Sequence, residues 1–168
     1  MDVYLIRHGE AVELNKEIVE DGFRYLTREG REKAVEVAKR LKYLDTGFDC
    51  IVSSPLVRAV QTAEIFAAVL NHTTKVKTAV ELIGGNTITR FKHLLQRNSH
   101  HKNIACFGHS PDVNHFATGL LKDHNVKELN LNFKTCSVCK IDYDLQSGIG
   151  KFVYFLKSDT MELVKGEK

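Results

Sequence analysis

Long apolar runs are missing from this sequence of 168 residues. The first apolar run, from Val3 to Ile6, follows the charged Asp2 and is too short for a signal peptide or a membrane-spanning segment. Linkers, internal repeats and low-complexity segments are missing as well. We therefore expect a single cytoplasmic domain over residues 1–168 with no membrane partner, and a loosely ordered tail over the lysine-rich residues 157–168.

A large excess of one charge is lacking too. The 24 basic and 21 acidic side chains leave a formal net charge of +3 and are spread along the chain. A dedicated nucleic-acid-binding protein carries a clustered basic surface, so we expect no nucleic-acid partner. Because 43% of the residues are hydrophobic, the chain has enough apolar material for a folded core.

Cysteine is too scarce for a disulfide scaffold, since the chain has only Cys50, Cys106, Cys136 and Cys139. Cys136 and Cys139 have the spacing of a redox or zinc motif, but they lie in a predicted strand, where residues three apart point to opposite faces. No second pair completes a zinc site. We expect no metal and no cofactor, because ligand spacing is also missing among the other histidines outside the turns described below: His72, His93, His100, His101, His115 and His124.

Short apolar runs rich in β-branched residues recur at residues 3–6, 50–52 and 104–107, each followed by a polar turn and a helical pattern. This alternation predicts an α/β fold with a mostly parallel sheet covered by helices on both faces, a three-layer α/β/α sandwich. Residues 135–143 and 151–156 flank a turn and predict an antiparallel hairpin at the edge of the sheet.

Four helices are predicted from the spacing of apolar residues. One begins after Thr27, a good N-cap residue, one near Pro55, one over residues 88–95 and one at Pro111. For the second helix, the expected buried face consists of Val60, Ala63, Ala67 and Leu70.

Polar side chains gather directly after three of the predicted strands. The turns begin Arg7-His8-Gly9-Glu10, Ser53-Ser54-Pro55 with Arg58 shortly after, and Gly108-His109. Ligands of open α/β sheets bind at the carboxyl ends of the strands, so these arginines and histidines are expected to converge on one rim.

These motifs resemble the histidine phosphatase superfamily, also called phosphoglycerate mutase-like. Arg7-His8-Gly9, Arg58 followed by Gln61-Thr62, and Gly108-His109 occur in the order of the family. The short chain, the Arg-His-Gly-Glu-Ala start and the segment Tyr25-Leu26-Thr27 are most similar to the SixA phosphohistidine phosphatase branch. The resemblance implies a hydrolase that passes through a phosphohistidine intermediate.

The chemistry of the residues agrees with this implication. A planar, permanently charged guanidinium binds two phosphate oxygens at once, which assigns Arg7 and Arg58 to phosphate binding. A neutral imidazole has a free lone pair, so His8 is the expected nucleophile, and His109 is expected to donate hydrogen bonds to the phosphoryl oxygens. Gly9 lets the backbone turn closely beside the phosphate. With two arginines neutralising charge, no metal ion is required.

The general acid and the substrate stay open. Glu81 follows the predicted third strand and is the candidate acid, although a phosphohistidine substrate whose leaving imidazole is already protonated needs less assistance. The family's usual serine is replaced by Ala11, and Asn15 falls one place late for its asparagine.

A chain this short has little room to cover its site, which favours a phosphorylated protein as substrate. The alternatives are a phosphatase for small phosphate esters and a phosphate-recognition module without turnover.

Overall fold

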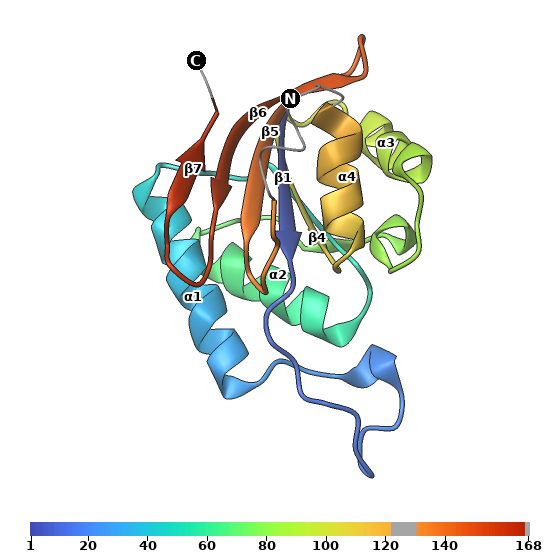
Figure 1. Ribbon diagram of the computed structural model, residues 1–168, viewed down its shortest axis with the longest axis vertical. Coiled ribbons are helices and arrows are strands. Elements are labelled where there is room, and N and C mark those ends of the chain that lie inside the picture. Colours follow the sequence, from blue (N-terminus) through green and yellow to red (C-terminus); the bar gives the residue numbers. More distant parts are fainter. Residues whose placement is uncertain (122–130, 167–168) are drawn as a thin grey trace.

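The computed structural model describes residues 1–121 and 131–166, and these residues form one seven-stranded sheet with helices on both faces (Figure 1). The first four strands in spatial order run parallel, and the last three are antiparallel to their neighbours. This arrangement confirms the predicted fold class. From one edge to the other, the strands are β3 (Lys77–Thr78), β2 (Cys50–Ser53), β4 (Asn103–Gly108), β1 (Asp2–Arg7), β5 (Val138–Asp144), β6 (Ile149–Leu156) and β7 (Leu163–Lys165).

The helices pack in two pairs. One face of the sheet is covered by α1 (Arg28–Tyr43) and α2 (Val57–Val69), the other by α3 (Ile88–Arg97) and α4 (Asp112–Leu121). Two short 3-10 helices, η1 (Asp21–Phe23) and η2 (Val80–Leu82), lie in the connections. Thr27 caps α1 as predicted, since its side chain accepts a hydrogen bond from Gly30 N–H. No helix in the described part of the chain is long and apolar enough to cross a membrane.

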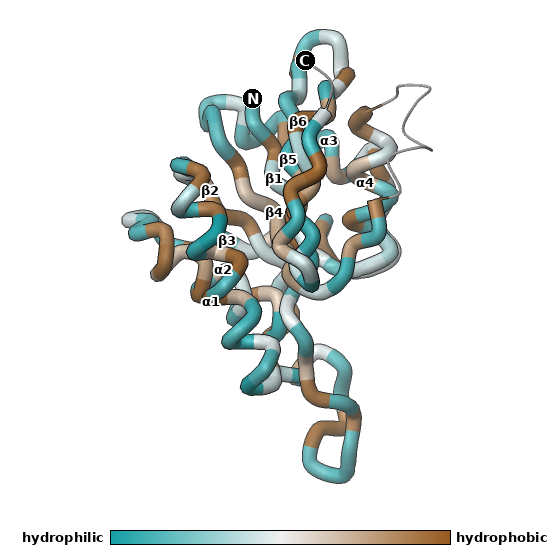
Figure 2. Tube along the Cα trace, turned by 60° about the vertical axis from the view of Figure 1, so that its left-hand side comes forward, coloured by the Kyte–Doolittle hydropathy of each residue, from teal (hydrophilic) through white to brown (hydrophobic). Residues whose placement is uncertain are grey.

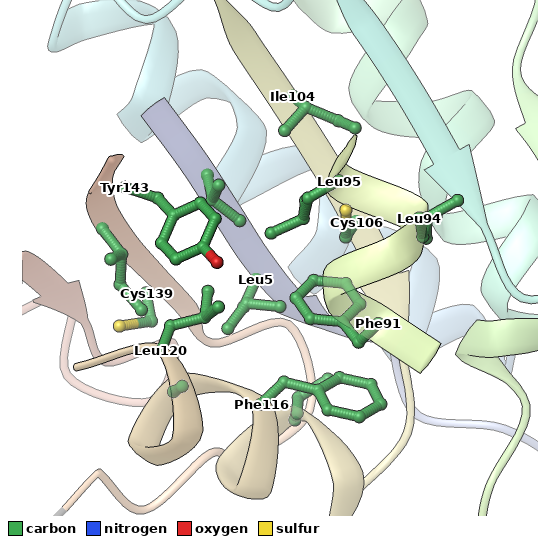
Figure 3. Close-up of a cluster of buried hydrophobic side chains, with 14 of the residues drawn as sticks. Leu5, Phe91, Leu94, Leu95, Ile104, Cys106, Phe116, Leu120, Cys139 and Tyr143 are labelled. Carbon is green, nitrogen blue, oxygen red and sulfur yellow. The ribbon is translucent and has the colours of Figure 1, made fainter. Parts of the chain in front are cut away.

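Alternating side chains of each central strand supply the two cores. In β1, Val3 and Leu5 face α3 and α4, where Phe91 and Phe116 stack with ring centroids 4.4 Å apart (Figure 3). Tyr4 and Ile6 face α1 and α2. Both faces of the central strands are therefore dry, which explains their uninterrupted apolar runs.

The cysteine pair follows the same division. Cys139 belongs to the core under α3 and α4, and Cys136 to the core under α1 and α2, so the two lie on opposite faces. The predicted reason is wrong, because Cys136 lies in a turn with a φ of 64° before β5 begins at Val138. Burial raises the pKa of the Cys136 thiol to about 12.

Two predicted details are wrong. The buried face of α2 consists of Arg58, Ala59, Thr62, Ala63 and Phe66, because two polar residues turn inward. Of the predicted residues, Ala63 is buried, Ala67 and Leu70 are half-buried against the same core, and Val60 is not part of it. The hairpin of β5 and β6 lies inside the sheet, because β7 adds a further strand beyond it. That strand falls within residues 157–168, where a loosely ordered tail is expected; residues 167–168 lie outside the described residues.

Candidate active site

Three neighbouring strands bring the predicted site residues together. His8 follows β1, Ser54 follows β2 and His109 follows β4, and these strands lie side by side in the order β2, β4, β1. The backbone N–H of His8 donates to Gly108 O at 3.0 Å, which fixes the two turns against each other. As a result, the rings of His8 and His109 lie with centroids 4.9 Å apart.

One nitrogen of His8 is occupied by the backbone, and the other faces Arg58. The Nδ1 atom lies 2.6 Å from Gly9 O, so it carries the proton and donates, which leaves the lone pair on Nε2. Arg58 Nε donates to this Nε2 atom at 3.2 Å. Burial is the largest cause that lowers the pKa of His8, to about 3; His109, Arg58 and Arg7 add to the shift, and the hydrogen bond to Gly9 O opposes it. His8 is therefore a neutral imidazole with an available lone pair at neutral pH.

Both backbone polar groups of Gly9 make hydrogen bonds, and one of these bonds orients the ring of His8. The carbonyl of Gly9 accepts from His8, and the N–H of Gly9 donates to Thr62 Oγ1 at 2.9 Å. A Cβ at this position would come within 3.0 Å of Gly30 O in α1. The close approach of these two chain segments therefore favours glycine at position 9. The φ angles of Gly9 and Gly108 lie outside the left-handed region, so backbone strain is not the reason.

Arg58 is buried in the first turn of α2 and is held from outside by Asp21 of η1. Its Nη1 donates to the backbone oxygen of Asp21 at 2.7 Å, and its Nη2 donates to Asp21 Oδ2 at 2.8 Å. These bonds lower the pKa of Asp21 from its ordinary value. Sequence reasoning missed Asp21, because its partner lies 37 positions away and no local pattern marks the pair.

Two buried nitrogens at the site have no hydrogen-bond partner among the described residues: Arg7 Nε and His109 Nδ1. Arg7 is anchored by its Nη1, which donates to Phe133 O at 2.8 Å. His109 is anchored by its Nε2, 2.8 Å from Ser54 Oγ. We assign the hydroxyl proton of Ser54 to the bond with His109 Nε2 and the imidazole proton to Nδ1, because this tautomer lets the unpartnered Nδ1 donate to an oxyanion; Ser54 Oγ also accepts a long bond from Leu56 N–H at 3.4 Å.

The charge state of His109 follows from the same surroundings. Burial lowers its pKa to about 4, and Arg58 and Arg7 add to this effect, while Asp21 and Asp112 oppose it. The free site therefore holds neutral imidazoles beside two guanidinium groups. Unpaired donors together with positive charge are what a phosphate or similar oxyanion needs.

Glu81 lies in a different environment from the other predicted residues. Its carboxylate binds Arg97 Nη2 of α3 at 2.7 Å. Partial burial alone would raise the pKa of Glu81, but Arg97 outweighs this and lowers it. No hydrogen bond joins Glu81 to His8, Arg58 or His109 within the described ranges.

Metal ligands are not clustered in the parts of the chain described, residues 1–121 and 131–166: no three His, Cys, Asp or Glu side chains are arranged to hold an ion. His124, one of the histidines considered above, lies outside these residues.

Part of the chain is similar in sequence to known proteins. Residues 3–83 match the model of the histidine phosphatase superfamily (branch 1). The chain is 47% identical over 68 residues to an uncharacterised protein of Picosynechococcus sp., a match that covers 40% of this chain and 41% of that protein. It is 37% identical over 87 residues to the serine/threonine-protein phosphatase Pgam5, mitochondrial, of Drosophila persimilis, with coverage of 51% and 29%. The chain thus spans less than half the length of these two curated relatives.

The fold is similar over a much larger share of the chain. The structure of the protein histidine phosphatase SixA complexed with tungstate superposes with a TM-score of 0.86, covers 96% of this chain and 100% of its own, and is 24% identical. The predicted fold is confirmed: the chain has the phosphoglycerate mutase-like fold of SixA, and residues 3–83 are similar to the histidine phosphatase superfamily, as the motifs predict.

Proposed function

We propose that the protein is a phosphatase in which His8 Nε2 attacks phosphorus while Arg7, Arg58 and His109 hold the phosphoryl oxygens. The observation that carries this proposal is that, within the described part of the chain, an unprotonated nitrogen, His8 Nε2, accepts only the Arg58 Nε–H bond and lies beside two buried nitrogens that make no hydrogen bond. His8 Nε2 has no proton, and beside it Arg7 Nε and His109 Nδ1 are buried without a partner in the described residues. Unpaired buried donors are unfavourable unless a ligand uses them.

The reaction proceeds in two displacements. First, the Nε2–P bond forms as the bond from phosphorus to the leaving group breaks, and the leaving group departs with the bonding electron pair. Water then attacks phosphorus, the Nε2–P bond breaks, and phosphate and neutral His8 are released. Arg7, Arg58 and His109 stabilise the charge that spreads over the oxygens in both steps. Because guanidinium groups supply the positive charge, the reaction is proposed to be independent of metal ions.

The proposed substrate is phosphohistidine in a protein. The similar proteins named above include a protein histidine phosphatase and a serine/threonine-protein phosphatase, which supports a phosphorylated protein in general. An imidazole leaving group that is already protonated needs no carboxylic acid, which suits a site whose candidate acid, Glu81, is ionised and paired with Arg97. We propose a cytoplasmic location, because Cys50, Cys106, Cys136 and Cys139 are all buried and unpaired.

The test is phosphate release in the presence of a chelator, from a histidine-phosphorylated protein, a serine-phosphorylated protein and a generic aryl phosphate. We expect the wild type to act fastest on the phosphohistidine protein and His8→Ala to release no phosphate. Preference for the aryl ester would shift the assignment to small phosphate esters. Phosphate release that stops in chelator would contradict the role given to the arginines.

A further inference from the structure

The segment that joins β1 to α1, residues 9–27, projects past the carboxyl ends of the strands (Figures 1 and 2). We call it the β1–α1 loop. It is fixed to the site at two points: Asp21 holds Arg58, and Gln61 Oε1 accepts from Leu26 N–H at 2.8 Å. Within the loop, Arg24 Nε donates to Val12 O at 2.6 Å and bridges the two arms. The loop is therefore a braced extension of the active site.

Exposed apolar side chains are concentrated on this loop. Seven large hydrophobic residues of the described chain are exposed, and four of them belong to the loop. Their exposed fractions are 53% for Leu14, 74% for Val19, 63% for Phe23 and 45% for Tyr25. Figure 2 shows the hydrophobic stretches alternating with hydrophilic ones along the projecting segment. Apolar groups gathered beside a reactive centre indicate a contact surface for another molecule.

The charge of the β1–α1 loop indicates which class of partner can bind to it. The loop carries five acidic and two basic side chains, a net charge of −3, whereas the whole chain has +3. Anionic membrane surfaces and nucleic acids attract basic segments, so neither fits a negatively charged loop. A protein surface with apolar and basic side chains fits both properties.

We propose that the β1–α1 loop is the docking surface for a phosphorylated protein substrate whose phosphorylated residue is flanked by apolar and basic side chains. This proposal rests on the phosphatase function proposed above. Val19 and Phe23 supply apolar contact. Glu13 and Asp21 are already paired with Arg24 or Arg58, so the basic flank pairs with the other loop carboxylates, Glu10, Glu17 and Glu20. Phe23 is two positions from Asp21, which holds Arg58, so a chain docked on Phe23 is brought next to the phosphate-binding arginine.

The experiment compares two synthetic phosphohistidine peptides, one with leucine and lysine on both sides of the phosphohistidine and one with glycine and glutamate. We expect the wild type to favour the leucine-lysine peptide by about tenfold in kcat/KM, as for truncation of a central interface residue. Phe23→Ser and Val19→Ser should abolish this preference and leave turnover of the aryl phosphate unchanged. Ile149→Ser is the matched control, because Ile149 is 49% exposed at the opposite end of the sheet.

Three results would overturn the docking proposal. The first is equal turnover of the two peptides by the wild type. The second is a loss of peptide preference in Ile149→Ser as large as that in Phe23→Ser. The third is a wild-type dimer that Phe23→Ser dissociates in sedimentation experiments, since the surface would then bind a second copy of the chain. Calorimetric binding of both peptides to His8→Ala separates docking from chemistry. If the wild type turns over no substrate, the phosphatase proposal fails, and the docking proposal still stands or falls on the difference in binding.

Discussion

At the scale of single residues, the environment of His8 determines which nitrogen can act. Gly9 O takes the Nδ1 proton, burial and nearby positive charge keep the ring neutral, and Nε2 is left facing the phosphate-binding groups. A histidine that was protonated at neutral pH would have no lone pair for attack. The low pKa therefore supports the chemistry rather than opposing it.

This assignment predicts how the two site histidines titrate. The imidazole resonances of His8 and His109, identified by comparison with His8→Ala and His109→Ala, should stay at their neutral positions from pH 8 down to about 5.5, below the ordinary histidine value. Added inorganic phosphate should raise the pKa of His109, because a bound anion favours the charged imidazole. A midpoint near about 6.5 for either histidine without phosphate would contradict the assignment.

Sequence reasoning identified some of these residues and not others for a physical reason. His8 and His109 stand directly after strands, where the rim of an α/β sheet is predictable from local pattern. Asp21 stands in a long connection, and its meeting with Arg58 depends on how that connection folds back. Glu81 stands after β3 as expected, but only the structure shows that Arg97 takes its carboxylate.

At the scale of elements, η1 and α2 act together to orient Arg58. Asp21 of η1 engages both terminal nitrogens of Arg58, which turns its Nε–H toward His8 Nε2. The backbone of α2 is tied in as well, because Thr62 accepts from Gly9 N–H and donates to Arg58 O at 2.7 Å. Arg58 and Thr62 therefore lie on the buried face of α2. The spacing of the apolar residues alone does not predict that these two polar residues face inward.

Loss of the Asp21 carboxylate should misplace Arg58. We expect Asp21→Ala to lower kcat by about tenfold or more, and Asp21→Asn, which keeps an oxygen acceptor for Nη2, to lower it less. Glu17→Ala is the matched control from the same loop and should be neutral. Steady-state kinetics on an aryl phosphate measure all three variants. Unchanged kcat in Asp21→Ala would show that Arg58 needs no external support.

At the scale of the whole molecule, the topology brings distant motifs together. Sequence positions 8, 54 and 109 meet because β2, β4 and β1 are adjacent and parallel. The alternation of strands and helices in the sequence predicted that these three turns meet at one rim of the sheet. The position of β7 was not predictable, because a strand of three residues with partly exposed side chains leaves almost no pattern.

The same buried histidines should make the folded protein sensitive to acid. Their pKa values of about 3 and about 4 lie below the value in the unfolded chain, so the unfolded state binds more protons once the pH falls below about 6.5. The free energy of unfolding should therefore fall by about 1–2 kcal/mol per histidine between about pH 7 and about pH 5. Denaturant unfolding of the wild type and of a His8→Gln, His109→Gln double variant measures this, and equal slopes against pH would contradict it.

The central claim is that the phosphoryl group passes through His8, and rapid-quench trapping tests it most directly. The protein is mixed with a histidine-phosphorylated protein, quenched in alkali within milliseconds, digested and analysed by mass spectrometry. We expect a transient phosphoryl group on His8 that decays as free phosphate rises, and none in His8→Ala. Phosphate release by the wild type with no phosphorylated His8 at any time, or by His8→Ala at a similar rate, would contradict the account.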